Sequence, residues 1–258
     1  MNTVDNYTII ANADDLGLRI SVNFAILQCF NAGFINSASL ITNSLIFDET
    51  VAMIKSEKHV RNIGVHIDLI EFKPLTSFCA PRFLNKEGNW SLTAVNNKLL
   101  ILNKKERHAF EQEIHAQIDK ALSAGLKIVH LDSHYHIHTL PAFYKLFINA
   151  AKKYNLKLRL AQSYSQGNYI TFLYRKWLNY LIKKNGNSYA DFFEDVQHFL
   201  SSRRSAERQL SVEIMLHPDL DGLGNLTDHY HPQTMKKWLE FLNQRGNSLK
   251  DNIRSIAS

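Results

Sequence analysis

The sequence predicts an α/β fold, more specifically a single (β/α) barrel over residues 1–258. Short apolar runs rich in β-branched residues alternate with longer amphipathic segments, a pattern typical of parallel strands joined by crossover helices. A length of 258 residues suits one such barrel. Polar residues follow five of the expected strands directly, and a barrel brings such positions together on one face.

In the first half of the chain, we expect strands over residues 7–13, 37–42 and 63–69. A helix that begins near Ser21 should end at Gly33, and a second helix over 48–57 has Asp48 as its expected N-cap. Residues 71–100 contain Pro74, Pro81 and Gly88 and predict a long loop, which in a compact domain is usually functional.

In the second half, strands are expected over residues 127–131, 156–161 and 211–216. Helices are expected over residues 104–124, 140–154, 169–184, 191–208 and 232–245. Gly125 should end the first of these helices, and Pro141 suits the first turn of the second. Gly222 and Gly224 predict a loop after the last strand.

Composition narrows the class of protein. A hydrophobic content of 45% with 21% charged residues is typical of a globular chain. There is no run of eighteen apolar residues, no signal-peptide pattern at the start, and only two cysteines, so a cytoplasmic protein is expected. The net charge of +6 comes from scattered basic pairs without a nucleic-acid-binding motif. We therefore expect no nucleic-acid partner, although the charge could attract anionic substrates or surfaces.

Residues 169–184 combine five aromatic and four basic residues at helical spacing. The favoured interpretation is an amphipathic helix on the barrel wall. The alternative is a peripheral contact with an anionic membrane, at the inner membrane face if the protein is cytoplasmic.

The richest chemical signal is the stretch from His130 to His138, which holds four histidines and one aspartate. If the backbone were extended there, every second residue would point to one side. Those residues are His130, Asp132, His134, His136 and His138. Neutral imidazole is the commonest metal ligand in proteins, so the stretch predicts a metal site, with a solvated histidine-rich turn as the alternative.

Other strand ends supply further ligands. Asp15, His66 and His134 form the natural set, because one carboxylate and two imidazoles leave a coordination position open. Oxygen and nitrogen donors without thiolate suit one divalent ion among Zn²⁺, Mg²⁺, Mn²⁺, Co²⁺ and Fe²⁺, and the donor set does not choose among these five. We expect Mg²⁺ or Zn²⁺, with Mn²⁺ and Co²⁺ as the alternatives. Asp132 is expected to orient one of the imidazoles.

The remaining candidates have roles in proton transfer or binding. Asp14 could act as a general base towards a metal-bound water, or could cap the following helix. His217 could protonate a leaving group. Asn43 could bind substrate or cap a turn, and His136 and His138 could line the pocket or be structural. His229 and His231 are expected in a solvated loop.

Taken together, four motifs resemble the YdjC/ChbG-like carbohydrate deacetylase family over nearly the whole chain. They are Asn12-Ala13-Asp14-Asp15-Leu16-Gly17, Gly64-Val65-His66, His130 to His138, and His217-Pro218. The resemblance implies a distorted TIM-like barrel related to polysaccharide deacetylases, a metal held by Asp15, His66 and His134, and often a homodimer. Leu16 departs from the usual aromatic residue, and Ile67-Asp68-Leu69-Ile70-Glu71 lacks a common threonine.

The resulting hypothesis is a metal-dependent hydrolase that removes the N-acetyl group of an amino sugar and releases acetate. The substrate would be a chitooligosaccharide or a lipid-linked N-acetylhexosamine. Two alternatives remain open: a metal-dependent phosphoester hydrolase, and a catalytically silent sugar-binding protein.

Overall fold

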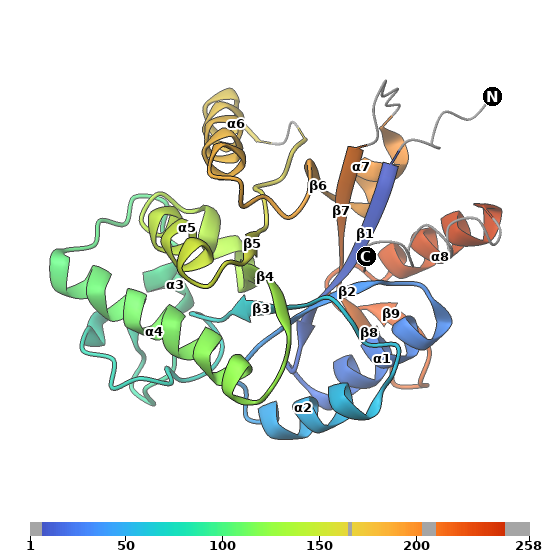
Figure 1. The fold of residues 1–258 in the computed structure, drawn as a ribbon, viewed down its shortest axis with the longest axis horizontal. Coiled ribbons are helices and arrows are strands. Elements are labelled where there is room, and N and C mark those ends of the chain that lie inside the picture. The colour runs from blue at the N-terminus through green and yellow to red at the C-terminus, as the bar shows by residue number, and fades with distance from the viewer. Residues whose placement is uncertain (1–6, 165–166, 203–209, 246–258) are drawn as a thin grey trace.

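The computed structural model describes residues 7–164, 167–202 and 210–245. At its centre is a curled sheet in the order β5-β4-β3-β2-β1-β7-β6, and every pair of neighbours is parallel (Figure 1). The strands are β1 (Tyr7–Leu16), β2 (Ser37–Leu40), β3 (Ile63–Ile67), β4 (Ile128–Ser133), β5 (Lys157–Leu158), β6 (Phe192–Asp195) and β7 (Leu210–Leu216). The α/β class predicted from the sequence is confirmed.

The sheet forms a half-barrel, which is consistent with the distorted barrel that was expected. It ends at β5 on one side and at β6 on the other. A parallel bridge pairs Leu158 of β5 with Ser188, which precedes β6, and the backbone N–H of Ser163 donates to the carbonyl of Phe193 in β6 over 2.9 Å. Because β5 has only two residues and β6 only four, the two edges offer too few backbone groups for a continuous hydrogen-bonded ladder.

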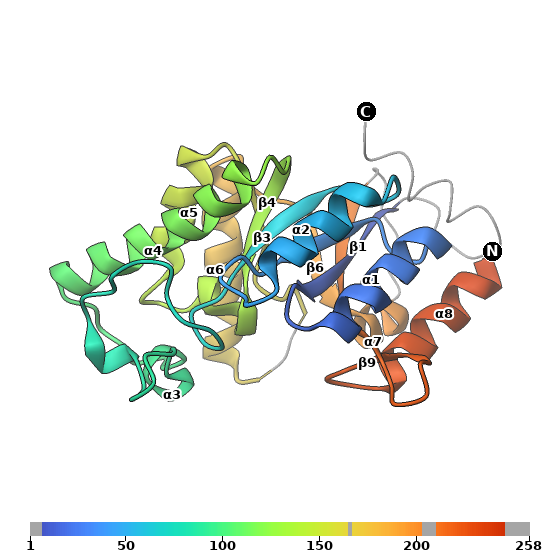
Figure 2. The same ribbon diagram turned by 90° about the horizontal axis from the view of Figure 1, so that it is seen from below.

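Helices cover the outer side of the sheet, where α1, α2 and α4 lie across the strands (Figure 2). The helices are α1 (Ile20–Ala32), α2 (Phe47–Ser56), α3 (Leu92–Val95), α4 (Lys104–Ser123), α5 (Tyr144–Lys153), α6 (Tyr169–Lys184), α7 (Val196–Ser201) and α8 (Gln233–Arg245). Two short 3₁₀ helices are η1 (Pro81–Phe83) and η2 (His134–Thr139). The described residues include no helix long and apolar enough to cross a membrane.

The two faces of the sheet differ in character. Along β1, Ile9, Ala11 and Ala13 belong to the apolar core, whereas Asn12 and Asp14 point to the opposite, inner face. That inner face is buried yet polar, and its side chains bond to one another across strands. Asn12 donates to Ser39 Oγ over 2.9 Å, for example. In a half-barrel with a buried polar interior, nearly every inward polar side chain needs a hydrogen-bond partner.

Most predicted elements are present, and the differences have local causes. Gly33 ends α1 with φ 72°, and the helix over 169–184 matches α6. The N-cap of α2 is Ile46, so the prediction for Asp48 is wrong by two residues. The helix predicted over 191–208 is wrong at its start, because residues 192–195 pair with β7 as β6 before α7 begins. Residues 203–208 of that prediction, and residues 1–6 and 246–258 of the predicted domain, lie outside the described residues.

The predicted loop around Gly222 and Gly224 is the tip of an unpredicted hairpin. Its strands, β8 (Pro218–Leu220) and β9 (Leu226–Asp228), pair antiparallel and directly follow His217. The hairpin returns the chain to the carboxyl end of β7, where the backbone N–H of His229 donates to the carbonyl of His217 over 3.1 Å.

Candidate active site

Asp14 and Asp15 end β1 and point in different directions. The pairing of β1 with β2 shifts between Ala13 and Leu16, and Asp15 has φ 67°, in the left-handed region. Few residues other than glycine adopt this conformation, although aspartate does so more readily than most. Such strained backbone is concentrated at functional sites. At this site it aims the Asp15 carboxylate towards β3 and η2, away from the environment of Asp14.

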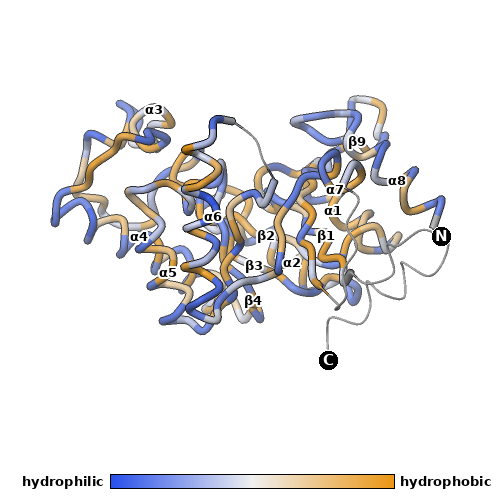
Figure 3. The backbone as a smooth tube through the Cα atoms, turned by 90° about the horizontal axis from the view of Figure 1, so that it is seen from above, coloured by the Kyte–Doolittle hydropathy of each residue, from blue (hydrophilic) through white to orange (hydrophobic). Residues whose placement is uncertain are grey.

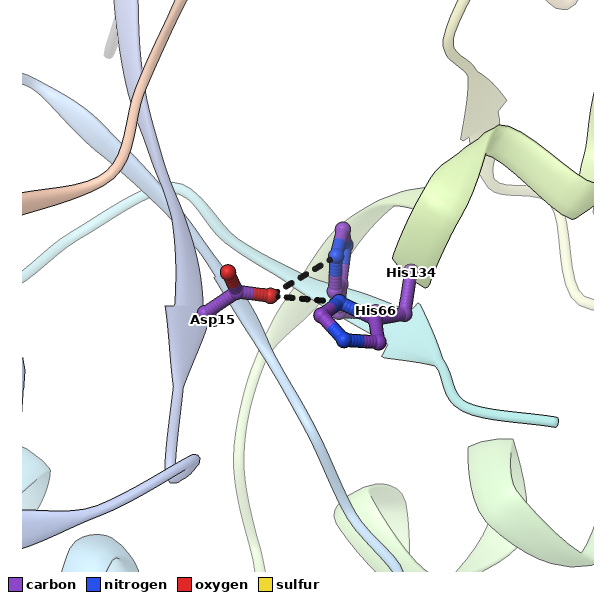
Figure 4. A group of neighbouring side chains, drawn as sticks. All are labelled: Asp15, His66 and His134. Carbon is purple, nitrogen blue, oxygen red and sulfur yellow. Dashed lines mark ion pairs between the residues drawn. The ribbon is translucent and has the colours of Figure 1, made fainter. Parts of the chain in front are cut away.

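Asp15, His66 and His134 converge at the carboxyl ends of β1, β3 and β4 (Figure 4). Oδ1 of Asp15 lies 2.7 Å from Nδ1 of His134 and 3.3 Å from Nε2 of His66. One donor atom from each residue fits within a mutual distance of 4.8 Å, and all three residues are buried. The three ligands expected from the sequence are therefore neighbours in space.

These residues fit a divalent cation. Oδ1 of Asp15 is buried and accepts no hydrogen bond of ordinary geometry, although two ring nitrogens face it. A buried carboxylate oxygen without a bonded partner is costly, and a cation would satisfy it together with both imidazoles. The donor set of one carboxylate and two imidazoles is the type found in catalytic sites with an open position.

The chain turns sharply after His134, so the condition of an extended backbone over residues 130–138 is not met beyond Ser133. Tyr135 and His136 have φ values of 53° and 55° within η2. Neither His136 nor His138 belongs to the donor group of Asp15, His66 and His134. His138 Nδ1 lies 2.7 Å from Ser133 Oγ, and His136 packs 5.6 Å from the ring of Phe193. Burial lowers the pKa of His136 to about 3, so this ring is neutral.

Asp132 holds His66 as the sequence suggested. Its Oδ1 lies 2.8 Å from Nδ1 of His66, which leaves Nε2 of the ring facing Asp15. Ser39 Oγ donates to the other oxygen of Asp132 over 2.7 Å and lies 3.0 Å from Nε2 of His130. Burial opposes a charged His66, but the carboxylates of Asp132 and Asp14 outweigh it and raise the pKa of His66 to about 10.

Arg159 links three acidic side chains on the inner face of the sheet. It was not among the residues predicted from the sequence. Its NH1 and NH2 groups donate to the two oxygens of Asp14, each over 2.6 Å. NH2 also lies 2.7 Å from Asp132, and Nε donates to Glu213 over 2.7 Å. Burial raises the pKa of Glu213 to about 7. The available signal was positional, because Arg159 directly follows β5 just as the other site residues follow their strands.

Arg159 also fixes the charge of Asp14. Burial would raise the pKa of Asp14, but the guanidinium outweighs burial and the net pKa is lowered. Asn12 donates to Oδ1 of the same carboxylate over 2.7 Å. Asp14 is therefore an ionised group whose remaining acceptor capacity lies at Oδ2.

His217 faces that oxygen from β7. Its Nε2 lies 4.0 Å from Oδ2 of Asp14, and its Nδ1 lies 3.7 Å from Oδ2 of Asp228 on β9. Burial opposes protonation, but Asp228, Asp15 and Asp14 together raise the pKa of His217. Asp228 also accepts the backbone N–H of His217 over 2.9 Å, so it holds both the ring and the main chain.

His229 corrects a prediction. It was expected in a solvated loop, but its Nε2 lies 3.1 Å from Oδ2 of Asp15 and its side chain is only 9% exposed. The hairpin of β8 and β9 carries it there, and no sequence pattern indicated that hairpin. His231 is exposed as expected. Next to the cluster, Tyr135 and Tyr230 are about half exposed, with ring centroids 6.3 Å apart.

Asn43 does not join the cluster. Its Nδ2 donates to Oδ2 of Asp68 over 2.9 Å and to the carbonyl of Lys73 over 3.1 Å. Asp68 in turn accepts backbone N–H groups from residues 70–72. This arrangement holds the start of the loop after β3, so Asn43 has a structural contact here while its predicted substrate contact remains a prediction.

Comparisons with known proteins identify the family of this chain. The family described as "YdjC-like protein" matches residues 8–247. A protein from Brevibacillus brevis named carbohydrate deacetylase is 29% identical over 218 residues, covering 81% of this chain and 80% of the relative. A chitooligosaccharide deacetylase from Yersinia pestis is 28% identical over 217 residues, covering 81% of each chain.

Solved structures agree on the fold. A crystal structure from Enterococcus faecalis, assigned to cellobiose-phosphate cleavage, superposes with a TM-score of 0.72 at 21% identity, covering 96% of this chain and 94% of that one. At this identity the likeness concerns the fold alone. The match to the family over nearly the whole chain, with the expected motifs gathered at one end of the sheet, means that this chain belongs to the YdjC-like protein family.

Proposed function

We propose that this protein is a metal-dependent deacetylase that hydrolyses the N-acetyl group of an amino sugar. The observation that carries the proposal is the convergence of Asp15, His66 and His134 beside an ionised carboxylate, Asp14, and a protonatable imidazole, His217. The names of the relatives in Brevibacillus brevis and Yersinia pestis support the same reaction.

Asp15, His66 and His134 would hold the metal ion. A divalent cation there would act as a Lewis acid towards the acetyl carbonyl and favour attack by water. Mg²⁺ and Zn²⁺ both suit the donor set, which contains no thiolate. His229, which contacts the second oxygen of Asp15, would hold that carboxylate in its orientation.

Asp14 would be the general base. Arg159 keeps it ionised, and its Oδ2 has the free acceptor capacity to take a proton from the attacking water. The guanidinium also fixes the carboxylate plane, so little reorganisation is needed when the proton moves.

His217 would be the general acid. Its raised pKa shifts the imidazole towards the protonated form, and it can give that proton to the sugar nitrogen as the C–N bond breaks. The products are acetate and a free amino sugar. Because Nε2 lies 4.0 Å from Oδ2 of Asp14, the two proton-transfer groups sit side by side next to the metal ligands.

The substrate class is a chitooligosaccharide or a lipid-linked N-acetylhexosamine. Tyr135 and Tyr230 would give the sugar ring two aromatic faces to pack against. The second group of possible donors is Asp14, His66 and Asp132. A two-metal phosphoester hydrolase is disfavoured, because both carboxylates of that group already bind the guanidinium of Arg159.

The test is acetate release from free, oligomeric and lipid-linked N-acetylhexosamines, assayed after chelation and after readdition of Mg²⁺, Zn²⁺, Mn²⁺ or Co²⁺. We expect release that depends on the added ion and a stoichiometry near one ion per chain. Sugar binding without acetate release under every condition would favour the sugar-binding alternative. Two ions per chain with phosphoester cleavage would favour the alternative of a metal-dependent phosphoester hydrolase.

A further inference from the structure

The outer face of α6 carries large apolar side chains that the described chain leaves largely exposed. The helix buries Leu178 and Ile182 towards the fold. On its other side, Tyr169, Ile170, Leu173, Trp177 and Tyr180 are between 45% and 77% exposed. They recur at helical spacing beside the exposed residues Lys176 and Lys184. We call these seven residues the α6 face.

Packing against the barrel wall therefore explains the apolar residues on only one side of α6. Figure 1 shows α6 at the periphery of the molecule, and Figure 3 shows both hydrophobic and hydrophilic stretches along it. Contiguous exposed apolar groups on a monomer usually mark an interaction site, since they stay in water at a cost in free energy.

The same region is strongly basic. Residues 133–190 contain nine lysines or arginines and no aspartate or glutamate, whereas the other 200 residues contain 21 basic and 24 acidic ones. Arg159 is buried among the carboxylates of the inner face, which leaves eight basic residues that can contribute to the surface. The exposed lysines of α5, including Lys145 and Lys152, add to those of α6. The two helices are in contact, because the rings of Tyr144 and Trp177 lie 5.4 Å apart. The excess positive charge of the chain is therefore concentrated in the region of the α6 face.

We propose that the α6 face docks on an anionic lipid surface. Aliphatic and aromatic side chains would enter the boundary between headgroups and acyl chains, and the lysine ammonium groups would reach the lipid phosphates. A second copy of the chain would bring two positive faces together. A nucleic acid would satisfy the charge but would leave the aliphatic groups of Ile170 and Leu173 without an apolar partner.

Docking here would bring the candidate active site close to the lipid. Tyr174 of α6 donates to the carbonyl of Thr139 over 2.8 Å, and Thr139 ends the short helix η2 that begins with His134. An N-acetylated sugar carried on a lipid would then meet the site at the surface. This consequence for the substrate rests on the proposed function, whereas the docking itself does not.

Vesicle co-sedimentation of the full chain provides the direct test. We expect binding to phosphatidylcholine vesicles that contain phosphatidylglycerol, weaker binding to pure phosphatidylcholine, and a loss of binding at high salt. Tryptophan fluorescence gives an independent signal, because Trp177 is 45% exposed whereas Trp90 and Trp238 are buried. Its emission should shift to shorter wavelength with anionic vesicles, and Trp177→Phe should remove that shift.

Two double variants separate the apolar and charged contributions. Ile170→Asp with Leu173→Asp should abolish sedimentation, and the control Leu45→Asp with Leu223→Asp changes two leucines elsewhere that are more exposed still. Lys176→Gln with Lys184→Gln should weaken binding about 25-fold, since each basic residue near an anionic surface contributes roughly fivefold. Lys86→Gln with Lys98→Gln is the matched control, because both lysines are exposed and lie outside α5 and α6.

Several outcomes would overturn the docking proposal. They are no binding to anionic vesicles, equal binding by the Ile170→Asp and Leu173→Asp variant, a dimer that this variant converts to a monomer in light scattering, or tighter binding to RNA than to vesicles. Acetate release from a soluble N-acetylated oligosaccharide should be unchanged in that variant, so failure to dock is distinguishable from failure of the deacetylase proposal.

Discussion

Asp14 and Asp15 are adjacent in sequence, but their carboxylates face different kinds of cationic or protonatable groups. Asp15 faces imidazoles from His66, His134 and His229, groups that can lose a proton and become metal ligands. Asp14 faces the guanidinium of Arg159, a permanent cation. The site therefore has two sides. The metal side, around Asp15, can bind a metal ion. On the other side, the guanidinium of Arg159 already neutralises the carboxylate of Asp14, and proton transfer can occur there.

The largest expected effect comes from the metal side. His134→Ala removes one of three donors, so both metal binding and metal-dependent acetate release should be lost. A Lewis acid contributes several kcal/mol, which corresponds to at least about a thousandfold in rate. Metal content by elemental analysis and acetate release measure the two effects. His108→Ala, which changes an exposed histidine on α4, is the control, and an active His134→Ala enzyme would contradict the assignment.

Asp14→Asn tests the other side of the comparison. It should lower kcat by roughly 10²–10⁴-fold, the usual contribution of a general base, while metal content stays near that of the unchanged protein. The amide keeps the shape of the carboxylate, and thermal unfolding checks that the fold survives. Loss of bound metal in this variant would mean that Asp14 is a ligand and that the two sides are not distinct.

Arg159→Leu removes the permanent cation and leaves three buried carboxyl groups, Asp14, Asp132 and Glu213. We expect a loss of about 3–5 kcal/mol in the free energy of unfolding, measured by urea denaturation at pH 8. The pKa values of these acids should rise in the folded variant, so its stability deficit should shrink as the pH falls and they become protonated.

A surface pair provides the control for this prediction. Arg82 bonds to Glu106 but is 53% exposed, and solvent screens exposed ion pairs, so Arg82→Leu should cost far less stability than Arg159→Leu. Equal stability losses for the two arginine variants would show that the buried network is not what stabilises the inner face.

The smallest expected effect is a shift in pH dependence. The pKa of His217 is raised by Asp228 together with Asp15 and Asp14, against the effect of burial. A general acid must be protonated, so activity should fall as the pH rises through this pKa. Asp228→Asn removes the carboxylate that contributes most to raising the pKa of His217. The alkaline limb of the pH–rate profile should therefore move to lower pH. An unchanged alkaline limb would exclude this role for Asp228.

Local patterns in the sequence were sufficient to predict most of the elements. The apolar run before Asp14, the amphipathic segment ended by Gly33 and the strand before Asp132 each depend on neighbouring residues only. The rule that parallel strands gather their carboxyl ends brought Asp15, His66 and His134 into one candidate site. Arg159 follows the same rule, although its partners could not be read from the chain.

Tertiary structure alone decided the rest. The positive φ of Asp15 and the turn at Tyr135 and His136 depend on contacts that hold an unfavourable backbone, so periodicity could not reveal them. The hairpin of β8 and β9 places Asp228 and His229 through long-range packing. The partners of Arg159 lie up to 145 residues away in sequence. The sequence by itself determined which residues carry the chemistry and at which edge of the sheet they lie. Which charged side chains pair with each other depends on the tertiary structure. Buried charged groups must be paired, and their partners come from strands that are far apart in the sequence.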